Sequence, residues 1–309
     1  MGQGWQDRIE YGFLRALEAG LGGLSARKAD RAGAMLGGLI RRPLGIRRDV
    51  VVANLRRAFP EASEAWIEET TISAYRHLGR EVTAMLRLSS LDPEAVRDLT
   101  VISDRCWTAV EDAFSEGRGV IFATGHYGNW EMAAAAVSAR GHPITAIVKG
   151  MRNQLVDRRI SDARRALGVE TTGLGEAPRR VPRALAAGHA VGIVADQDAR
   201  RSGVFVPFFG IPASTHRGPA LFALRTGAPL MASIARRLPD GRYLVDARRI
   251  DASRTDDFEA DILRVTGELA SALEREIRID PTQYFWFHKR WKTSPFEEPP
   301  SRLTGITST

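Results

Sequence analysis

Cysteine is nearly absent from this chain, which contains one, Cys106, among 309 residues. One cysteine excludes an intrachain disulfide and any metal site built from several cysteines. The chain therefore fits a reducing compartment, and we expect Cys106 to be a small residue of the core.

Long apolar runs are also lacking. A bilayer-spanning helix needs about 18 to 20 consecutive apolar residues, and the best candidate, around residues 32–40, is interrupted by Arg31, Arg41 and Arg42. The N-terminus shows no basic and then apolar leader with a cleavage site, and Gln6 stands where N-myristoylation requires Ser or Thr. We therefore expect a protein that does not cross the bilayer.

Nucleic-acid modules, such as paired Cys/His zinc spacing or an aromatic-rich sheet motif, are missing as well, so no nucleic acid is expected as a partner. What the chain has is positive charge, with 44 Lys and Arg against 37 Asp and Glu. This charge favours anionic partners: phospholipid headgroups, phosphorylated glycolipids or an acidic carrier protein. A hydrophobic content of 44% is enough for one large core with a helical appendage.

Residues 1–95 are predicted to form a helical, membrane-associating N-terminal segment. In residues 5–24, apolar side chains recur every three to four positions, which indicates an amphipathic helix. This helix can lie in a membrane interface or pack on the rest of the protein, and its apolar face fits both. Further helices are predicted at 48–58 and 63–88, where Ser63 is a candidate N-cap.

Residues 96–295 are predicted to form an α/β domain, because short apolar runs alternate with helical stretches. Strands are predicted at 119–123, 144–148 and 190–195, and a hairpin at 229–246. Covering helices are predicted at 129–139, 153–167, 177–187 and 256–278. The fold class is therefore a mixed central sheet flanked by helices, with parallel strands ending at one edge. Residues 296–309, rich in Pro, Ser and Thr, are predicted to be a loose tail.

One segment, GVIFATGHYGNWE at 119–131, joins a predicted strand to a histidine and a carboxylate. His126 follows the strand, and Glu131 lies in the first turn of the next helix. We expect Glu131 to accept one ring N–H, which fixes the tautomer and leaves the other nitrogen of His126 basic. The arrangement suits attack by a substrate hydroxyl on a thioester or ester. The bare spacing also occurs by chance around surface or capping histidines.

The stretch HYGNWE at 126–131 resembles the His-x-x-x-x-Asp/Glu box of glycerolipid acyltransferases, specifically the late acyltransferases of lipid A biosynthesis. The resemblance continues in order over about residues 48–295. The further matching segments are NL at 54–55, AFPE at 58–61, ADQD at 195–198, GVFVPFFG at 203–210, STHRGPALFALRTGAP at 214–229 and QYFWFHKRWKTSP at 283–295.

This resemblance implies transfer of a fatty acyl chain from acyl carrier protein to a hydroxyl of a lipid A precursor. The reaction would take place at the cytoplasmic face of the bacterial inner membrane. His126 and Glu131 would be the catalytic residues, with no cofactor and no metal. The oxyanion donors would be backbone amides around 128–130 or a nearby arginine. Members of the family usually have an N-terminal spanning helix, so peripheral attachment is expected here.

Eight polar residues are candidates for substrate binding. They are Asn129, Arg152, Asn153, Arg164, Asp196, Gln197, His288 and Arg290. The two arginines and the asparagine at 152–164 match polar positions of the family, and guanidinium groups suit phosphate; a solvated helix face is the alternative. The pair at 196–197 follows a strand and would bind sugar hydroxyls or position the base. The last two lie in an aromatic and basic run that suits a lipid interface, or packs its aromatics in the core.

Other functions remain open for the same residues. A related enzyme would acylate a phosphoinositide mannoside or a lysophospholipid with the same base. A His/Glu thioesterase would use water in place of the lipid hydroxyl, and a non-catalytic lipid-binding protein would need only the amphipathic helix and the basic charge. A serine hydrolase is disfavoured, because no Gly-x-Ser-x-Gly elbow occurs.

Overall fold

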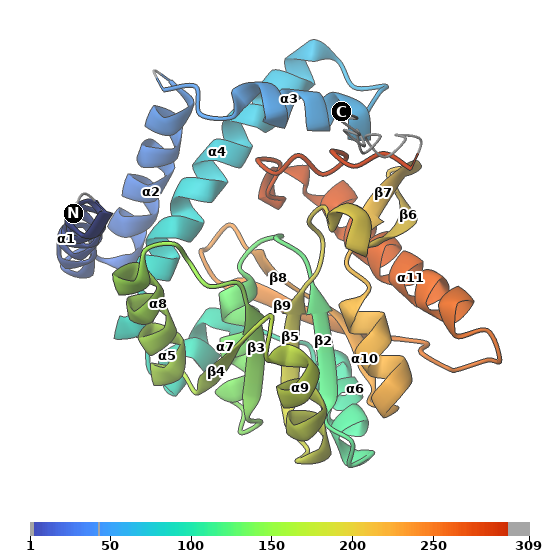
Figure 1. The fold of residues 1–309 in the computed structure, drawn as a ribbon. Coiled ribbons are helices and arrows are strands. Elements are labelled where there is room, and N and C mark those ends of the chain that lie inside the picture. The colour runs from blue at the N-terminus through green and yellow to red at the C-terminus, as the bar shows by residue number, and fades with distance from the viewer. Residues whose placement is uncertain (1–2, 43, 296–309) are drawn as a thin grey trace, which may run out of the picture.

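The computed structural model describes residues 3–42 and 44–295, so the predicted tail at 296–309 lies outside the described residues. A helical N-terminal layer sits above an α/β body in Figure 1. The C-terminal segment, residues 280–295 and coloured red, runs between the two.

The body is built on a seven-stranded mixed sheet with the order β1-β9-β8-β2-β5-β3-β4. Its strands are β1 (Thr100–Val101), β2 (Val120–Thr124), β3 (Ile144–Val148), β4 (Val169–Gly173), β5 (Ala190–Val194), β8 (Leu230–Arg237) and β9 (Tyr243–Ile250). β8 and β9 pair antiparallel, and the other neighbours pair parallel. The predicted fold class is confirmed. Because β2 is central and covered on both faces, residues 120–123 are all buried.

Helices cover both faces of the sheet and produce two separate apolar layers. α6 (Asp104–Ser115) and α7 (Trp130–Ser138) pack on one face, with α5 (Pro93–Leu99) beside α7. On the other face lie α9 (Ala177–Ala186), α10 (Gly218–Thr226) and α11 (Phe258–Ile279). α8 (Gln154–Ala166) packs beside the edge strand β4. The four helices predicted after residue 128 are confirmed to within two residues.

The N-terminal layer contains α1 (Gln3–Gly22), α2 (Ala26–Arg41), α3 (Arg48–Ala58) and α4 (Glu64–Leu86). The predicted cap is confirmed, since Ser63 Oγ accepts from the amide of Trp66 at 3.2 Å. α2 and α4 touch through their backbones, and a Cβ added at Gly37 or Gly79 would collide with the facing main chain. None of the helices in residues 3–42 and 44–295 is both long and apolar enough to cross a bilayer.

A hairpin and the C-terminal segment join the layer to the body. β6 (Val204–Phe208) and β7 (Ile211–Thr215) form a two-stranded antiparallel sheet, which the sequence analysis did not predict. The side chain of Asn54 on α3 donates to the carbonyls of Trp286 and His288, both at 2.7 Å. Trp286 is 1% exposed and belongs to the same apolar cluster as Phe208. The aromatics of this run therefore pack in the core, which was the alternative to a lipid interface.

Candidate active site

The turn between β2 and α7 carries His126 and is hydrogen-bonded along its length. The amide of Gly128 donates to the carbonyl of Gln283 at 3.0 Å, and that of Asn129 donates to Ala235 at 2.8 Å. Phe285 donates to the carbonyl of His126 at 2.9 Å. Gly128 has φ +57°, and any Cβ there would collide with the carbonyl oxygen of Ala235. The turn is therefore fixed, and a glycine is required within it.

The carboxylate that orients His126 is Asp196, at the end of β5. Nδ1 of His126 lies 2.7 Å from Asp196 Oδ1, and the backbone amide of His126 donates to Oδ2 at 3.0 Å. Burial opposes ionisation of Asp196, but the charge and hydrogen bonds of His126 prevail and lower its pKa to about 2. Burial likewise works against the imidazolium, and Asp196 more than offsets it, so the pKa of His126 is raised.

The prediction that Glu131 accepts a hydrogen bond from the ring of His126 is wrong. Both oxygens of Glu131 instead accept from Arg164, at 2.8 Å from Nε and 2.6 Å from Nη2, in a bidentate ion pair. The indole of Trp130 adds a bond of 3.1 Å to Glu131. Glu131 acts on His126 through its charge alone, which contributes to the raised pKa of the imidazole.

A cleft of about 940 Å³ opens beside the His126 ring. The imidazole side chain is 24% exposed, and Trp130 stands over it edge-on with a centroid separation of 4.7 Å. Within the described ranges, Nδ1 is the ring nitrogen that has a hydrogen-bond partner, so Nε2 is available to a ligand. Glu131 and Arg164 line the same cleft. His126, Glu131 and Arg164 therefore share one solvent-accessible space.

The two ends of this cleft differ in polarity. One arm runs between the sheet and helices α6 and α7 and is almost wholly apolar. Its lining residues include Cys106, Trp107, Val110, Phe122, Ala133, Ala134, Val137, Ile144, Ala146 and Ala247. The mouth carries the polar lining, in which the four cations outnumber the three carboxylates. These residues are Lys149, Arg164, Arg200 and Lys292, the carboxylates Glu131, Asp157 and Asp198, and the side chains of Gln197, His216 and His288. Cys106 is 6% exposed, as expected for a core residue, and burial raises its pKa to about 11.

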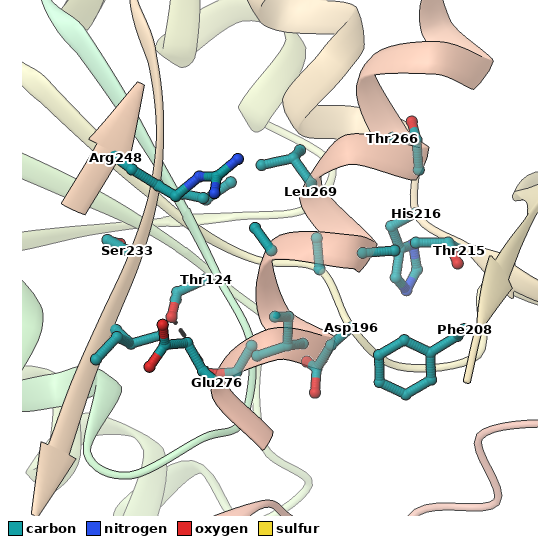
Figure 2. Close-up of a pocket in the computed structure, with 18 of the residues that line it drawn as sticks. Thr124, Asp196, Phe208, Thr215, His216, Ser233, Arg248, Thr266, Leu269 and Glu276 are labelled. Atoms are coloured by element: carbon teal, nitrogen blue, oxygen red, sulfur yellow. Dashed lines mark hydrogen bonds between the residues drawn. The ribbon is translucent and has the colours of Figure 1, made fainter. Parts of the chain in front are cut away.

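A smaller cavity of about 60 Å³ lies on the other side of Asp196, between the sheet and α11. Figure 2 shows Asp196 between Phe208 and the α11 residue Glu276. The hydroxyl of Thr266 in its wall is buried without a hydrogen-bond partner. This volume has room for a few water molecules. The larger cleft is therefore the candidate substrate site.

The other sequence candidates divide into those at the cleft and those away from it. Gln197 and His288 line its mouth, and the ring Nε2 of His288 accepts from the amide of Asp198 at 3.0 Å. Arg290 is 2% exposed and donates to the Ser214 carbonyl and the Thr215 hydroxyl, both at 2.6 Å, so it is held in the core.

Three further candidates for substrate binding, like Arg290, are away from the lining of the cleft. Arg152 is exposed outside it. Asn153 is 6% exposed, caps α8, and donates to the carbonyl of Asp7 and to Glu10 of α1, both at 2.9 Å. Asn129 is 4% exposed and caps α7. The two asparagines thus have structural partners, and a short amide that begins a helix is a signal of capping.

Two residues at the mouth of the cleft, Arg200 and His216, were not predicted from the sequence. Arg200 follows β5 in the same connection as Asp196, and His216 precedes α10, so the signal was their place after strand ends. In the described part of the chain, no group of three or more His, Cys, Asp or Glu side chains is placed to hold a metal ion.

Comparison with known proteins gives a consistent assignment over almost the whole chain. Residues 10–293 match the sequence profile described as bacterial lipid A biosynthesis acyltransferase. The phosphatidylinositol mannoside acyltransferase of Mycolicibacterium smegmatis is 27% identical over 97% of this chain and 93% of that protein. The lipid A biosynthesis lauroyltransferase of Escherichia coli is 28% identical over 88% and 87%, and the palmitoleoyltransferase of the same organism is 26% identical over 86% and 85%.

Proposed function

The chain belongs to the bacterial lipid A biosynthesis acyltransferase family, and on that premise we propose that it transfers a fatty acyl chain to a glycolipid hydroxyl with His126 as the general base. The acyltransferase class follows from the family and confirms the resemblance drawn from the sequence. One observation carries the proposed role of His126. Its Nδ1 is hydrogen-bonded to the buried carboxylate of Asp196, while the rest of the ring faces a cleft with a long apolar arm.

In the proposed mechanism, Asp196 accepts a hydrogen bond from the Nδ1–H group of His126, which fixes the tautomer and leaves Nε2 basic. Nε2 removes the proton of the acceptor hydroxyl as that oxygen attacks the thioester carbonyl. The imidazolium that forms is stabilised by Asp196, whose low pKa keeps it ionised. The proton then passes to the departing thiolate as the C–S bond breaks. One ester and one thiol result, without a covalent acyl-enzyme.

Arg164 is the side chain that we propose to stabilise the developing oxyanion. The amides of Gly128 and Asn129, which were sequence candidates for this role, donate to Gln283 and Ala235 instead. Glu131 holds Nε and Nη2 of Arg164, and its rigid fork leaves Nη1 for a ligand in the cleft. Glu131 is then a positioning residue for Arg164.

The apolar arm is proposed to hold the acyl chain. Small side chains on α7, Ala133 and Ala134, leave space between the helix and the sheet. An alkyl chain placed there gains about 0.8 kcal/mol for each buried methylene group. The donor group would enter past the basic mouth, which suits the phosphates of an acyl carrier protein's prosthetic group. We propose acyl carrier protein as the donor.

The proposed acceptor is a lipid A precursor, whose phosphates fit the cations Lys149, Arg200 and Lys292 at the mouth. A phosphatidylinositol mannoside is the second candidate, because the mycobacterial enzyme that is named for it matches 97% of this chain. Both are anionic glycolipids with hydroxyl groups. The basic mouth by itself fits either one.

We propose that the protein binds peripherally to the cytoplasmic face of the bacterial inner membrane through α1 and α2. Trp5 and Phe13 of α1 are 68% and 66% exposed, and Met35 and Leu39 of α2 are 72% and 56% exposed. Arg8, exposed on α1, supplies positive charge for anionic headgroups. Through the contacts of Asn153, α1 lies beside α8, whose residues Asp157, Ile160 and Arg164 line the cleft.

Product analysis by mass spectrometry tests the function. The purified protein is incubated with an acylated carrier protein or acyl-coenzyme A, and with a lipid A precursor or a phosphatidylinositol mannoside. We expect one acceptor to gain the mass of one acyl chain, and His126→Ala to abolish the gain. Release of free fatty acid without an acylated lipid would instead indicate a thioesterase.

A further inference from the structure

A buried polar cluster lies behind the catalytic turn, outside the lining of both the cleft and the smaller cavity. It consists of Glu81 on α4, Asn129 at the start of α7, Arg237 at the end of β8 and Tyr243 at the start of β9. We call these four residues the Glu81 cluster. Asn129 and Tyr243 are 4% and 3% exposed, and the side chains of Glu81 and Arg237 are 10% and 14% exposed.

Each charge in the Glu81 cluster is paired. Oε2 of Glu81 accepts from Asn129 Nδ2 at 2.8 Å and from the Tyr243 hydroxyl at 3.0 Å. Oε1 accepts from Arg237 Nη1 at 3.1 Å, and Nη2 of Arg237 donates to Asp30 of α2 at 2.6 Å. Buried polar groups that are satisfied in this way tolerate little displacement, because each lost partner leaves an unsolvated group.

The Glu81 cluster is connected at two points to the end of the turn that leads from His126 into α7. At the first, Oδ1 of Asn129 accepts from the amide of Met132 at 2.9 Å, which begins α7. At the second, Gln283 binds the backbone of Arg237 in both directions, at 2.8 Å and 2.9 Å. The carbonyl of Gln283 then accepts from Gly128 at 3.0 Å. Asn129 was a candidate for substrate binding, but these contacts use its side chain fully.

We propose that Glu81 is a positioning residue for acyl transfer. Through Asn129 it holds the turn in the conformation in which His126 keeps its hydrogen bond to Asp196. This inference rests on the proposed function. His126 lies only three residues before Asn129 in the same turn, so a shift of Asn129 changes the distance between His126 and Asp196. A displacement of about 1 Å at a reacting group can cost about 100-fold in rate. A helix of the N-terminal layer thereby contributes to the chemistry of a cleft that its residue Glu81 does not touch.

An exchange of the two side chains separates positioning from plain stabilisation. Glu81→Gln leaves one acceptor oxygen where Asn129 and Arg237 need two, and Asn129→Asp sets two carboxylates against each other. In the double variant the amide on α4 donates to the new carboxylate, its oxygen accepts from Arg237, and the carboxylate still caps α7. The hydrogen bond between α4 and α7 is then restored with its direction reversed.

We expect each single variant to lower kcat about 100-fold with KM for donor and acceptor changed less than about threefold. The double variant should recover to within about tenfold of the unmodified enzyme. In Glu81→Gln the acidic limb of the kcat profile should move to lower pH, because a looser contact with Asp196 raises the pKa of His126 less. Plain destabilisation would not move that limb.

Asp261→Asn is the matched control, since it also neutralises a buried carboxylate with a short hydrogen bond, 2.6 Å from the amide of Thr255 near the first turn of α11. It should lower the unfolding temperature and leave kcat and its pH profile unchanged. If Glu81→Gln does not fold, Tyr243→Phe removes one bond to Glu81 and should give a smaller loss of kcat with the same pH shift.

The unmodified enzyme is assayed first. If it transfers no acyl group, the proposed function has failed and the inference fails with it. If it is active and the single variants keep its kcat, or if the folded double variant does not recover, the positioning role alone is overturned.

Discussion

Asp196→Asn is the substitution that most sharply probes the chemistry at His126. Asparagine keeps the shape of the side chain but removes the negative charge that lies 2.7 Å from Nδ1. The carboxylate is 4% exposed, so water screens this pair little. Two unit charges about 4 Å apart in an effective dielectric of about 20 interact by about 4 kcal/mol. If the imidazolium in the transition state loses that much, kcat should fall about 1000-fold.

The assay is the initial rate of thiol release with saturating donor and acceptor, measured against pH. His126 must be neutral to act as a base, so the rate rises with pH through its raised pKa. Without the charge of Asp196 that pKa falls, and the acidic limb of the profile should move to lower pH. Glu276→Gln, on the far side of Asp196 in the smaller cavity, is the control and should leave the limb in place. If Asp196→Asn keeps kcat within tenfold and leaves the acidic limb in place, the carboxylate of Asp196 does not support His126 in this way.

Four further predictions follow from the same structure. Arg164→Ala should lower kcat at least about 100-fold, because it removes the proposed oxyanion donor and unpairs Glu131, whereas Arg164→Lys should recover part of the rate in the same assay. Ala134→Phe should lower kcat/KM about tenfold or more for the longest acyl donors and spare short ones in a chain-length series, since overpacking the apolar arm costs about 1–3 kcal/mol. Phe13→Ser should weaken binding to anionic vesicles about tenfold in a sedimentation assay, because burial of a large apolar side chain contributes about 1.5–3 kcal/mol. Finally, the difference in unfolding temperature between the unmodified protein and Asp196→Asn should be largest between about pH 4 and 6.5. The pKa of Asp196 is lowered, so its contribution to the free energy of unfolding is lost as pH falls through about 2. The pKa of His126 is raised, so its contribution is lost as pH rises through the pKa of the folded-state imidazole. Thermal scans across pH that show a constant difference would contradict this.

The sequence was most informative where one local signal decides the structure. β2, β3 and β5 are short runs of mainly apolar, buried or half-buried residues with turn residues on either side, and the helices between them have regular apolar spacing. Their positions were therefore predictable, and so was the edge of the sheet where His126 lies. β6 and β7 were missed because Pro207 and Pro212 interrupt the strand pattern, and their pairing depends on packing against α11 and the C-terminal segment.

The hydrogen-bond partner of His126 was harder to predict from the sequence, because the partner is chosen by proximity in the folded structure. Glu131 is five residues away and Asp196 seventy, but β2 and β5 are hydrogen-bonded neighbours whose carboxyl ends meet. An aspartate directly after a buried strand was a candidate for positioning the base, and the structure puts it there. The assignment of Asn129 and Asn153 to substrate failed because capping and binding use the same short polar side chains.

In the proposed mechanism, the imidazole of His126 removes the proton of the attacking hydroxyl. The rate of acyl transfer in a single turnover, measured for the unmodified enzyme and for His126→Ala with matched unfolding temperatures, tests this most directly. We expect a rate at least about 100-fold lower for the variant. Equal rates from a folded His126→Ala protein would contradict it.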